Sequence, residues 1–438
     1  MDHHPPVSRK EAVYLAGCAS LLLCAPLLFG ALAGEASAAI AAGWSCLALV
    51  GAFSLSRRDV RAFRPLIICA AGFAVTLVFA GLSLTDVIPG TAQPIWAQSG
   101  LDPAATLDRS ETRLEIMKLS GLGMTFLVGW GLGCRDDTAS RAFKVATWSG
   151  VAFAGIGIVM HLAHFGPKTQ PGRLEATLLN PNTAGALCGA VLCLCIGMAL
   201  GSFRQARQGS DRWRFALAMA GSLGAFSALL LTFSRGALAA TALAMAAMLV
   251  ARAVARRWTA AQMAIGAGAF AAAGVLLLIV NVQLASRLSA LGADALLRRY
   301  IFDSHWRAFT EAPVLGYGLG GFDTLNRIRL SADNYASLWN IRSAENVYLQ
   351  WLVEGGVLTA LPMFATIGFV VARTATQAVR RRAMLGPLHS LLAVDLVFLL
   401  HGIVDFALQT YAIAVFWSFL LGLQLSWSAR SSRRVAGQ

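Results

Sequence analysis

Apolar residues run along this chain in long stretches separated by short polar segments. A helix needs about 20 mainly apolar residues to cross a bilayer. The stretches that meet or approach this length are 12–33, 36–54, 65–84, 114–133, 143–165, 183–202, 214–233, 236–251, 258–281, 347–372, 386–404 and 407–427. The pattern predicts an all-α integral membrane protein with about twelve transmembrane helices.

The basic residues lie mainly in alternate polar segments. If the N-terminus lies in the cytoplasm, every cytoplasmic segment carries Arg or Lys, as the positive-inside rule requires. We therefore expect both termini in the cytoplasm. The net charge of +14 comes from clusters between apolar runs in a chain that is 57% hydrophobic, so we expect contact with membrane lipids and not with nucleic acid.

One long polar break divides the chain into three parts. We expect transmembrane helices 1–9 in residues 1–281, a loop domain in 282–344, and transmembrane helices 10–12 with a cytoplasmic tail in 345–438. The same alternation puts the loop domain outside the cytoplasm. It puts three shorter segments and one hinge on the same side, at 85–111, 166–182, 233–236 and Asp405.

Two arginines on this outer side, Arg173 and Arg235, are candidate ligands for a phosphate. Arginine keeps its charge at ordinary pH and binds phosphate oxygens in a bidentate manner. A single arginine at a helix end also occurs as a lipid-headgroup anchor. The pair favours a lipid-linked phosphate or diphosphate, and we include Ser234 beside Arg235 as a substrate-binding candidate.

Asn180 before Pro181 has the pattern of a helix N-cap followed by proline in the first turn. The N-terminus of that helix would face outward, where its positive dipole end favours an anion. Simple capping explains the pair equally well. Asn180 and Asn182 are nevertheless candidates for binding substrate.

Glu345 is the best candidate for an acid or base. It stands with Asn346 where the loop domain meets the next apolar run, and Tyr348 follows. A carboxylate at a low-dielectric boundary has a raised pKa, which suits a general base. The alternative is that Glu345 and Asn346 only cap the next helix. Asp405 is a second carboxylate that either caps its helix or orients a neighbouring arginine.

Other motifs carry less chemistry. Gly316 to Gly321 contain a formal GxGxxG, but the preceding segment 298–311 looks helical, so we interpret the glycines as a turn that ends a helix. His161 and His164 have no obvious partner for a metal site. The eight cysteines form no CxxC pair and predict neither a disulfide framework nor a zinc site.

Five motifs in order resemble the bacterial O-antigen ligase and polymerase superfamily across about residues 85–425. They are Arg-Leu-Glu-Ala-Thr-Leu-Leu-Asn-Pro-Asn at 173–182, Thr-Phe-Ser-Arg-Gly at 232–236, Pro-Val-Leu-Gly-Tyr-Gly-Leu-Gly-Gly-Phe at 313–322, Glu-Asn-Val-Tyr-Leu-Gln-Trp-Leu-Val-Glu-Gly-Gly at 345–356, and His-Gly-Ile-Val-Asp-Phe-Ala-Leu-Gln at 401–409.

The resemblance implies a glycosyltransferase of GT-C-like architecture in the bacterial inner membrane, with a large periplasmic loop. Such proteins move a glycan from undecaprenyl diphosphate to an acceptor, without a nucleotide sugar, an essential metal or another cofactor. The acceptor is lipid A–core in ligases and another lipid-linked repeat unit in polymerases. Arg173 and Arg235 match the family's outer arginines, which are thought to engage the donor diphosphate.

Glu345 stands where ligases carry the histidine that is proposed to activate the acceptor hydroxyl. This departure favours a polymerase of a surface or exported polysaccharide. An O-antigen ligase is the alternative. A lipid-linked glycan transporter is less favoured, because the spans contain almost no ionisable residue at depth. A scaffold beside polysaccharide export proteins of the cell envelope is a further alternative.

Overall fold

The computed structural model describes residues 8–52, 60–166, 169–207, 212–256, 291–380 and 385–429. Within these ranges the chain is mainly helical, and ten helices are long and apolar enough to cross a membrane. The long helices are α1 (Arg9–Leu27), α2 (Gly34–Ala52), α3 (Val60–Leu82), α5 (Arg109–Gly133), α6 (Asp136–Leu162), α7 (Pro181–Arg207), α8 (Arg212–Leu231), α9 (Arg235–Arg256), α15 (Val347–Arg380) and α17 (Tyr411–Ala429), and α16 (Leu385–His401) is a shorter apolar helix.

These helices confirm the prediction of an all-α, multi-pass membrane protein. Each one overlaps a predicted span. The remaining predicted span, 258–281, lies outside the described residues, as does the first part of the predicted loop domain, 282–290.

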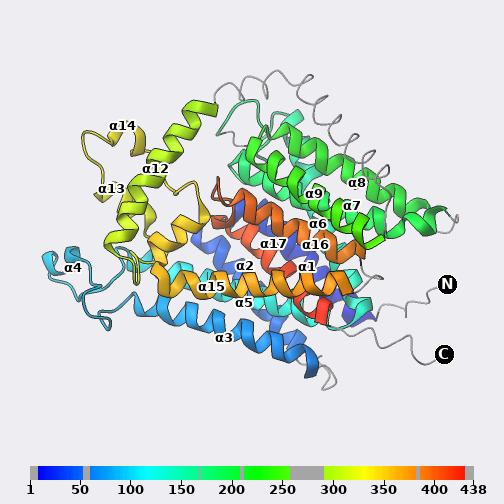
Figure 1. Ribbon diagram of the computed structural model, residues 1–438, viewed down its shortest axis with the longest axis horizontal. Helices are drawn as coiled ribbons and strands as arrows, with labels where there is room; N and C mark the ends of the chain where they lie inside the picture. The colour runs from blue at the N-terminus through cyan, green and yellow to red at the C-terminus, as the bar shows by residue number, and fades with distance from the viewer. Residues whose placement is uncertain are drawn as a thin grey trace.

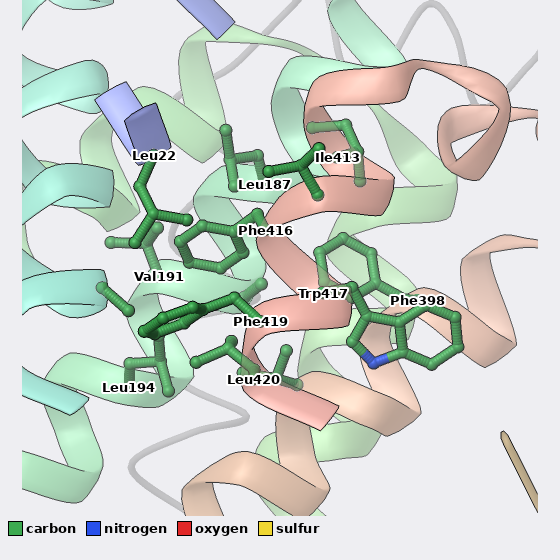
Figure 2. Packing of buried hydrophobic residues seen from close by; sticks show 14 of the residues in the cluster. Leu22, Leu187, Val191, Leu194, Phe398, Ile413, Phe416, Trp417, Phe419 and Leu420 are labelled. Carbon is green, nitrogen blue, oxygen red and sulfur yellow. The ribbon is translucent and has the colours of Figure 1, made fainter. Parts of the chain in front are cut away.

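The centre of the bundle is formed by α17 and α7. Burial inside the protein covers 89% of the apolar window of α17 and 78% of that of α7, against 22% for α2 and α3. Figure 2 shows Phe416, Trp417 and Phe419 of α17 among side chains of α1, α7 and α16. The outer helices therefore leave most of their apolar surface for lipid.

Glycines allow α5 and α17 to approach closely. A Cβ added to Gly129 would lie 2.1 Å from the carbonyl oxygen of Phe419. One added to Gly422 would lie 2.0 Å from that of Phe126. Small residues at such positions let transmembrane helices pack backbone against backbone.

An aspartate lies deep in the bundle, on a helix that is otherwise apolar. Asp395 of α16 is 1% exposed. Its two carboxylate oxygens accept hydrogen bonds from Trp417 Nε1 at 2.8 Å and Gln424 Nε2 at 2.9 Å. A buried carboxylate is tolerated here because both oxygens find donors on α17, which ties the two helices together.

The connecting segments that were predicted on one side gather at one end of the bundle, which we call the loop end. Leu107 N donates to Tyr317 O, Leu174 N to Leu231 O, and Val347 N to Gly402 O, each at 2.8 Å. The helices of the loop end lie beyond the bundle in Figure 1; they are the 21-residue α12 (Leu291–Glu311) and the short α4 (Pro94–Gln98), α13 (Phe322–Ile328) and α14 (Tyr335–Leu338). The compartment that this end faces stays a prediction.

The glycine-rich segment after α12 fastens the loop end to the bundle. Gly316, Gly318 and Gly320 have φ values of 66°, 90° and 76°. A Cβ on Gly318 would lie 1.9 Å from Thr106 Oγ1, and one on Gly316 would lie 2.4 Å from Val353 O. The expected turn at the end of a helix is confirmed, since α12 ends at Glu311. Its glycines serve close packing against α15 and the start of α5.

Candidate functional site at the loop end

The turn 402–406 between α16 and α17 is where the candidate residues converge. Val347 N donates to Gly402 O at 2.8 Å, and Asn346 Nδ2 donates to Ile403 O at 2.9 Å, so the start of α15 is fixed on this turn. Asn182 Nδ2, in the first turn of α7, donates to Asp405 Oδ2 at 2.8 Å.

The start of α9 reaches the same turn. A Cβ on Gly236 would lie 3.3 Å from Val404 Cγ2 and 3.6 Å from His401 Cδ2. The N-termini of α7, α9 and α15 therefore surround one turn. Helix N-termini carry unpaired N–H groups and a partial positive charge, so their convergence favours an anionic ligand.

Arg173 is held in one orientation by its neighbours. The residue is 6% exposed. Nε donates to Thr232 O at 2.7 Å, NH2 donates to Asn182 Oδ1 at 2.9 Å, and NH1 donates to Gln170 Oε1. The guanidinium is thus a fixed positive charge.

Asn182 joins Arg173 to Asp405. Its side-chain oxygen accepts from Arg173, and its side-chain nitrogen donates to Asp405. The sequence left open whether Asp405 caps a helix or orients an arginine. The contacts favour the second role, exerted through Asn182.

Asn180 is the N-cap of α7. Its Oδ1 accepts from Asn182 N at 2.7 Å and from Thr183 N at 3.2 Å, and the helix begins at Pro181. The capping prediction is confirmed. The amide oxygen is used by the helix, so the contacts of Asn180 are explained without a substrate.

Ser234 and Arg235 begin α9. Ser234 is 2% exposed, and its Oγ accepts from Ala237 N at 3.3 Å. Arg235 is half-buried at the first position of the helix. Thr232, whose carbonyl accepts from Arg173, lies three residues before Arg235. The segment that leads into Arg235 is therefore the one that holds Arg173.

Glu345 has an unusual backbone and a shifted acidity. Its φ is 52°, in the left-handed region that few non-glycine residues adopt. Burial, and secondly the negative charge of Asp405, raise the pKa of Glu345 to about 7, while Arg298 opposes the shift. The Arg298 NH2 to Glu345 Oε2 distance is 3.8 Å. A carboxyl group with this pKa accepts and releases a proton near neutral pH.

Asn346, and not Glu345, supplies the capping side chain of α15. Asn346 Oδ1 accepts from Leu349 N at 2.9 Å. Tyr348 lies two residues further on. Its hydroxyl donates to Leu399 O at 2.8 Å, and the residue lines an apolar groove between α3, α5, α15 and α17.

The sequence did not single out His401 as a site residue. His401 and Asp405 are each 1% exposed. Among the described residues, both ring nitrogens of His401 and Oδ1 of Asp405 have no hydrogen-bond partner. An unsatisfied buried polar group costs about 1–3 kcal/mol, so these atoms are candidates to hydrogen-bond a ligand. The sequence signal for this pair was its spacing: His401 and Asp405 stand four residues apart beside a polar hinge.

No part of the described chain brings together three or more His, Cys, Asp or Glu side chains that could hold a metal ion. The groups in or beside the turn 402–406 are Asp405 and His401, the starts of α7, α9 and α15, Arg173 held through Asn182, Arg235 at the first position of α9, and Glu345 with its pKa near neutrality. This set can bind an anion and move a proton.

Comparison with known proteins gives one family. The model of a family described as O-antigen ligase matches residues 220–364. The matched range begins in α8 and includes Arg235, the helices α12, α13 and α14 and Glu345, but it excludes α4, Arg173 and Asp405. No curated protein matches the chain.

Proposed function

We propose that this chain, which belongs to the O-antigen ligase and polymerase superfamily, transfers a glycan from undecaprenyl diphosphate to an acceptor hydroxyl at the loop end. The observation that carries the proposal is the turn 402–406. A fixed arginine reaches it through Asn182, and a carboxyl group with a pKa of about 7 lies beside it.

The arginines act on the leaving group. When the bond between the anomeric carbon and the diphosphate oxygen breaks, the diphosphate keeps the bonding electrons and gains negative charge. Arg173, Arg235 and the start of α9 stabilise this charge. Because Arg173 is already fixed by hydrogen bonds, little reorganisation is needed during the reaction.

Glu345 acts on the acceptor. Its carboxylate takes the proton from the acceptor hydroxyl while the oxygen of that hydroxyl bonds to the anomeric carbon. The products are the lengthened glycan and the lipid diphosphate, so no further reactant is needed. The described loop helices beside Glu345 would hold the acceptor in line, which is a positioning effect.

The carboxylate at position 345 favours a polymerase of a surface or exported polysaccharide, because ligases of the superfamily carry histidine there. The description of the matched family favours an O-antigen ligase. On either reading the protein resides in the bacterial inner membrane with the loop end in the periplasm.

The test is reconstitution of the purified protein in liposomes. Lipid-linked repeat units extracted from native membranes are supplied with and without lipid A–core. We expect longer glycans on the lipid carrier. Transfer to lipid A–core alone would show that the protein acts as a ligase and not as a polymerase. Correctly inserted protein that lengthens no glycan and transfers none would contradict the proposal.

A further inference from the structure

The helix α15 consists of two helical parts that meet at Gly356. This glycine has φ 62° and ψ −175°, which are not helical values. The rings of Tyr348 and Phe364, one on each side of it along the chain, have centroids 5.7 Å apart. The chain therefore folds back at Gly356. The first part, 347–355, is a short helix that begins two residues after Glu345.

The far end of this short helix is bonded to the glycine-rich segment that follows α12. Tyr317 N donates to Val353 O at 3.0 Å, and Val357 N donates to Pro313 O at 2.8 Å. The short helix thus extends from the candidate base to the segment that fastens the loop end to the bundle.

Two buried polar side chains lie along the short helix. Gln350 is 6% exposed and Glu354 is 5% exposed. Gln350 Oε1 accepts from Ala344 N at 3.2 Å, and Gln350 Nε2 donates to Glu354 Oε1 at 3.1 Å. The Glu354 carboxylate also interacts with the backbone N–H groups of Gly320 and Phe322. The two side chains therefore connect the residue before the candidate base to the glycine-rich segment.

Glu345 is supported on both sides along the chain. Its φ of 52° is unfavourable for a residue with a side chain and persists only where the surroundings enforce it. Two hydrogen bonds to the turn 402–406 fix the residues that follow Glu345. The hydrogen bond from Ala344 N to Gln350 fixes the residue that precedes it.

We propose that Gln350 and Glu354 are positioning residues that hold Glu345 in its left-handed conformation beside the turn 402–406. This proposal rests on the proposed function and deepens it, because it states how the base is kept in place. Glu354 accepts from the amide nitrogen of Gln350 and so leaves the amide oxygen facing Ala344 N. Gln350 in turn holds the backbone next to the base.

The acidity of Glu345 reports its position. Its side chain is 24% exposed, and burial is the largest cause that raises its pKa to about 7. The charge of Asp405 adds to this shift and Arg298 opposes it, while His401 is a further titratable group beside the same turn. A Glu345 released by Gln350 would relax toward solvent, and its pKa would fall because burial is lost.

One substitution breaks both hydrogen bonds with little change in side-chain volume, namely Gln350→Leu. Gln424→Leu on α17 is the matched control. Gln424 is fully buried and donates to Asp395 Oδ2 at 2.9 Å, so this variant breaks an equivalent pair of an amide and a carboxylate elsewhere in the bundle. The exchange Gln350→Glu with Glu354→Gln keeps both hydrogen bonds and reverses the second, so it should restore what Gln350→Leu loses.

Labelling with dicyclohexylcarbodiimide measures the protonation of Glu345 without any glycan transfer. This reagent modifies protonated carboxyl groups in apolar surroundings, and mass spectrometry locates the modified residue. In wild-type protein in nanodiscs, labelling of Glu345 should be half-maximal near pH 7. In Gln350→Leu the midpoint should fall by about one pH unit, which lowers the protonated fraction at pH 7 from about a half to about a tenth.

The control and the exchange decide what the shift means. Gln424→Leu and the exchange should both keep the wild-type midpoint. A midpoint that stays near pH 7 in Gln350→Leu, or that falls equally in Gln424→Leu, would overturn the proposal. So would an exchange variant that behaves as Gln350→Leu does.

The rate of glycan lengthening supplies the second measurement. Gln350→Leu should lower kcat about tenfold per folded protein and leave KM near the wild-type value, because a displaced base weakens the transition state and not substrate binding. A shifted labelling midpoint in protein that transfers no glycan would keep the positioning role and reject the proposed function. Transfer by the wild type with an unshifted midpoint in Gln350→Leu would keep the function and reject the positioning role.

Discussion

Two aspartates near the end of the chain are equally buried but differ in how their oxygens are used. Asp395 and Asp405 are each 1% exposed. Both oxygens of Asp395 accept hydrogen bonds from α17. In Asp405 one oxygen accepts from Asn182, and the other has no hydrogen-bond partner among the described residues.

This difference distinguishes a carboxylate that is fully hydrogen-bonded within the fold from one that is not. A buried carboxylate with both oxygens bonded contributes to the packing of its helices. One that keeps an unsatisfied oxygen beside an arginine network and a second carboxyl group is costly to the fold, and for this reason we propose a role in function for Asp405. Four substitutions test the distinction, beginning with the one expected to matter most.

Arg173→Ala should have the largest effect on activity. It removes a fixed positive charge that the hydrogen bonds of Asn182 connect to Asp405. Loss of one such group from a charge-stabilising site typically lowers the rate about 10²–10³-fold. The measurement is the rate of glycan transfer per inserted protein. Arg299→Ala, at a side chain that is 80% exposed, is the control and should behave as the wild type.

Glu345→Gln should lower the rate about 10²-fold, the lower end of the usual contribution of a general base, and should change the pH profile. The pKa of Glu345 is about 7, so its carboxylate form accumulates as pH rises through 7. Wild-type activity should therefore rise across this range. The residual activity of Glu345→Gln should lack that rise. An unchanged profile would mean that another group is the base.

Asp405→Asn should have a moderate effect, about tenfold on the rate, because Arg173 loses part of its positioning through Asn182. It should also shift the pH midpoint of activity downward, because the charge of Asp405 is one cause of the raised pKa of Glu345. A merely structural role for Asp405 would leave that midpoint in place.

Asp395→Leu should have the smallest effect on activity and a clear effect on stability. It leaves the donors of Trp417 and Gln424 unpaired in the core, at about 1–3 kcal/mol. Thermal unfolding in detergent should occur at lower temperature, while the rate per folded protein stays at the wild-type value. A large loss of activity in the folded fraction would remove the contrast with Asp405.

Much of the fold follows from local patterns in the sequence. Apolar length predicted the helices of the described bundle, and the Asn180–Pro181 pair predicted the start of α7. The glycines from Gly316 predicted the end of α12. These features depend on residues close together in the chain, where propensity and capping decide the structure.

The connections within the site do not follow from such patterns. Asn182 and Asp405 are 223 residues apart, and their hydrogen bond depends on how α7 packs beside the turn 402–406. Asp395 was missed because a single aspartate in an apolar run gives no sign of its partners on α17. The groove depends likewise on the packing of four helices.

The central claim is that the loop end transfers glycans from a lipid diphosphate, and product analysis of the reconstituted wild-type protein tests it most directly. Lipid-linked repeat units should disappear as lipid-linked chains grow by whole repeat units. One molecule of undecaprenyl diphosphate should be released for each unit added. Lipid-linked repeat units that cross the bilayer unchanged in length, with no lipid diphosphate released, would contradict the account and identify a transporter.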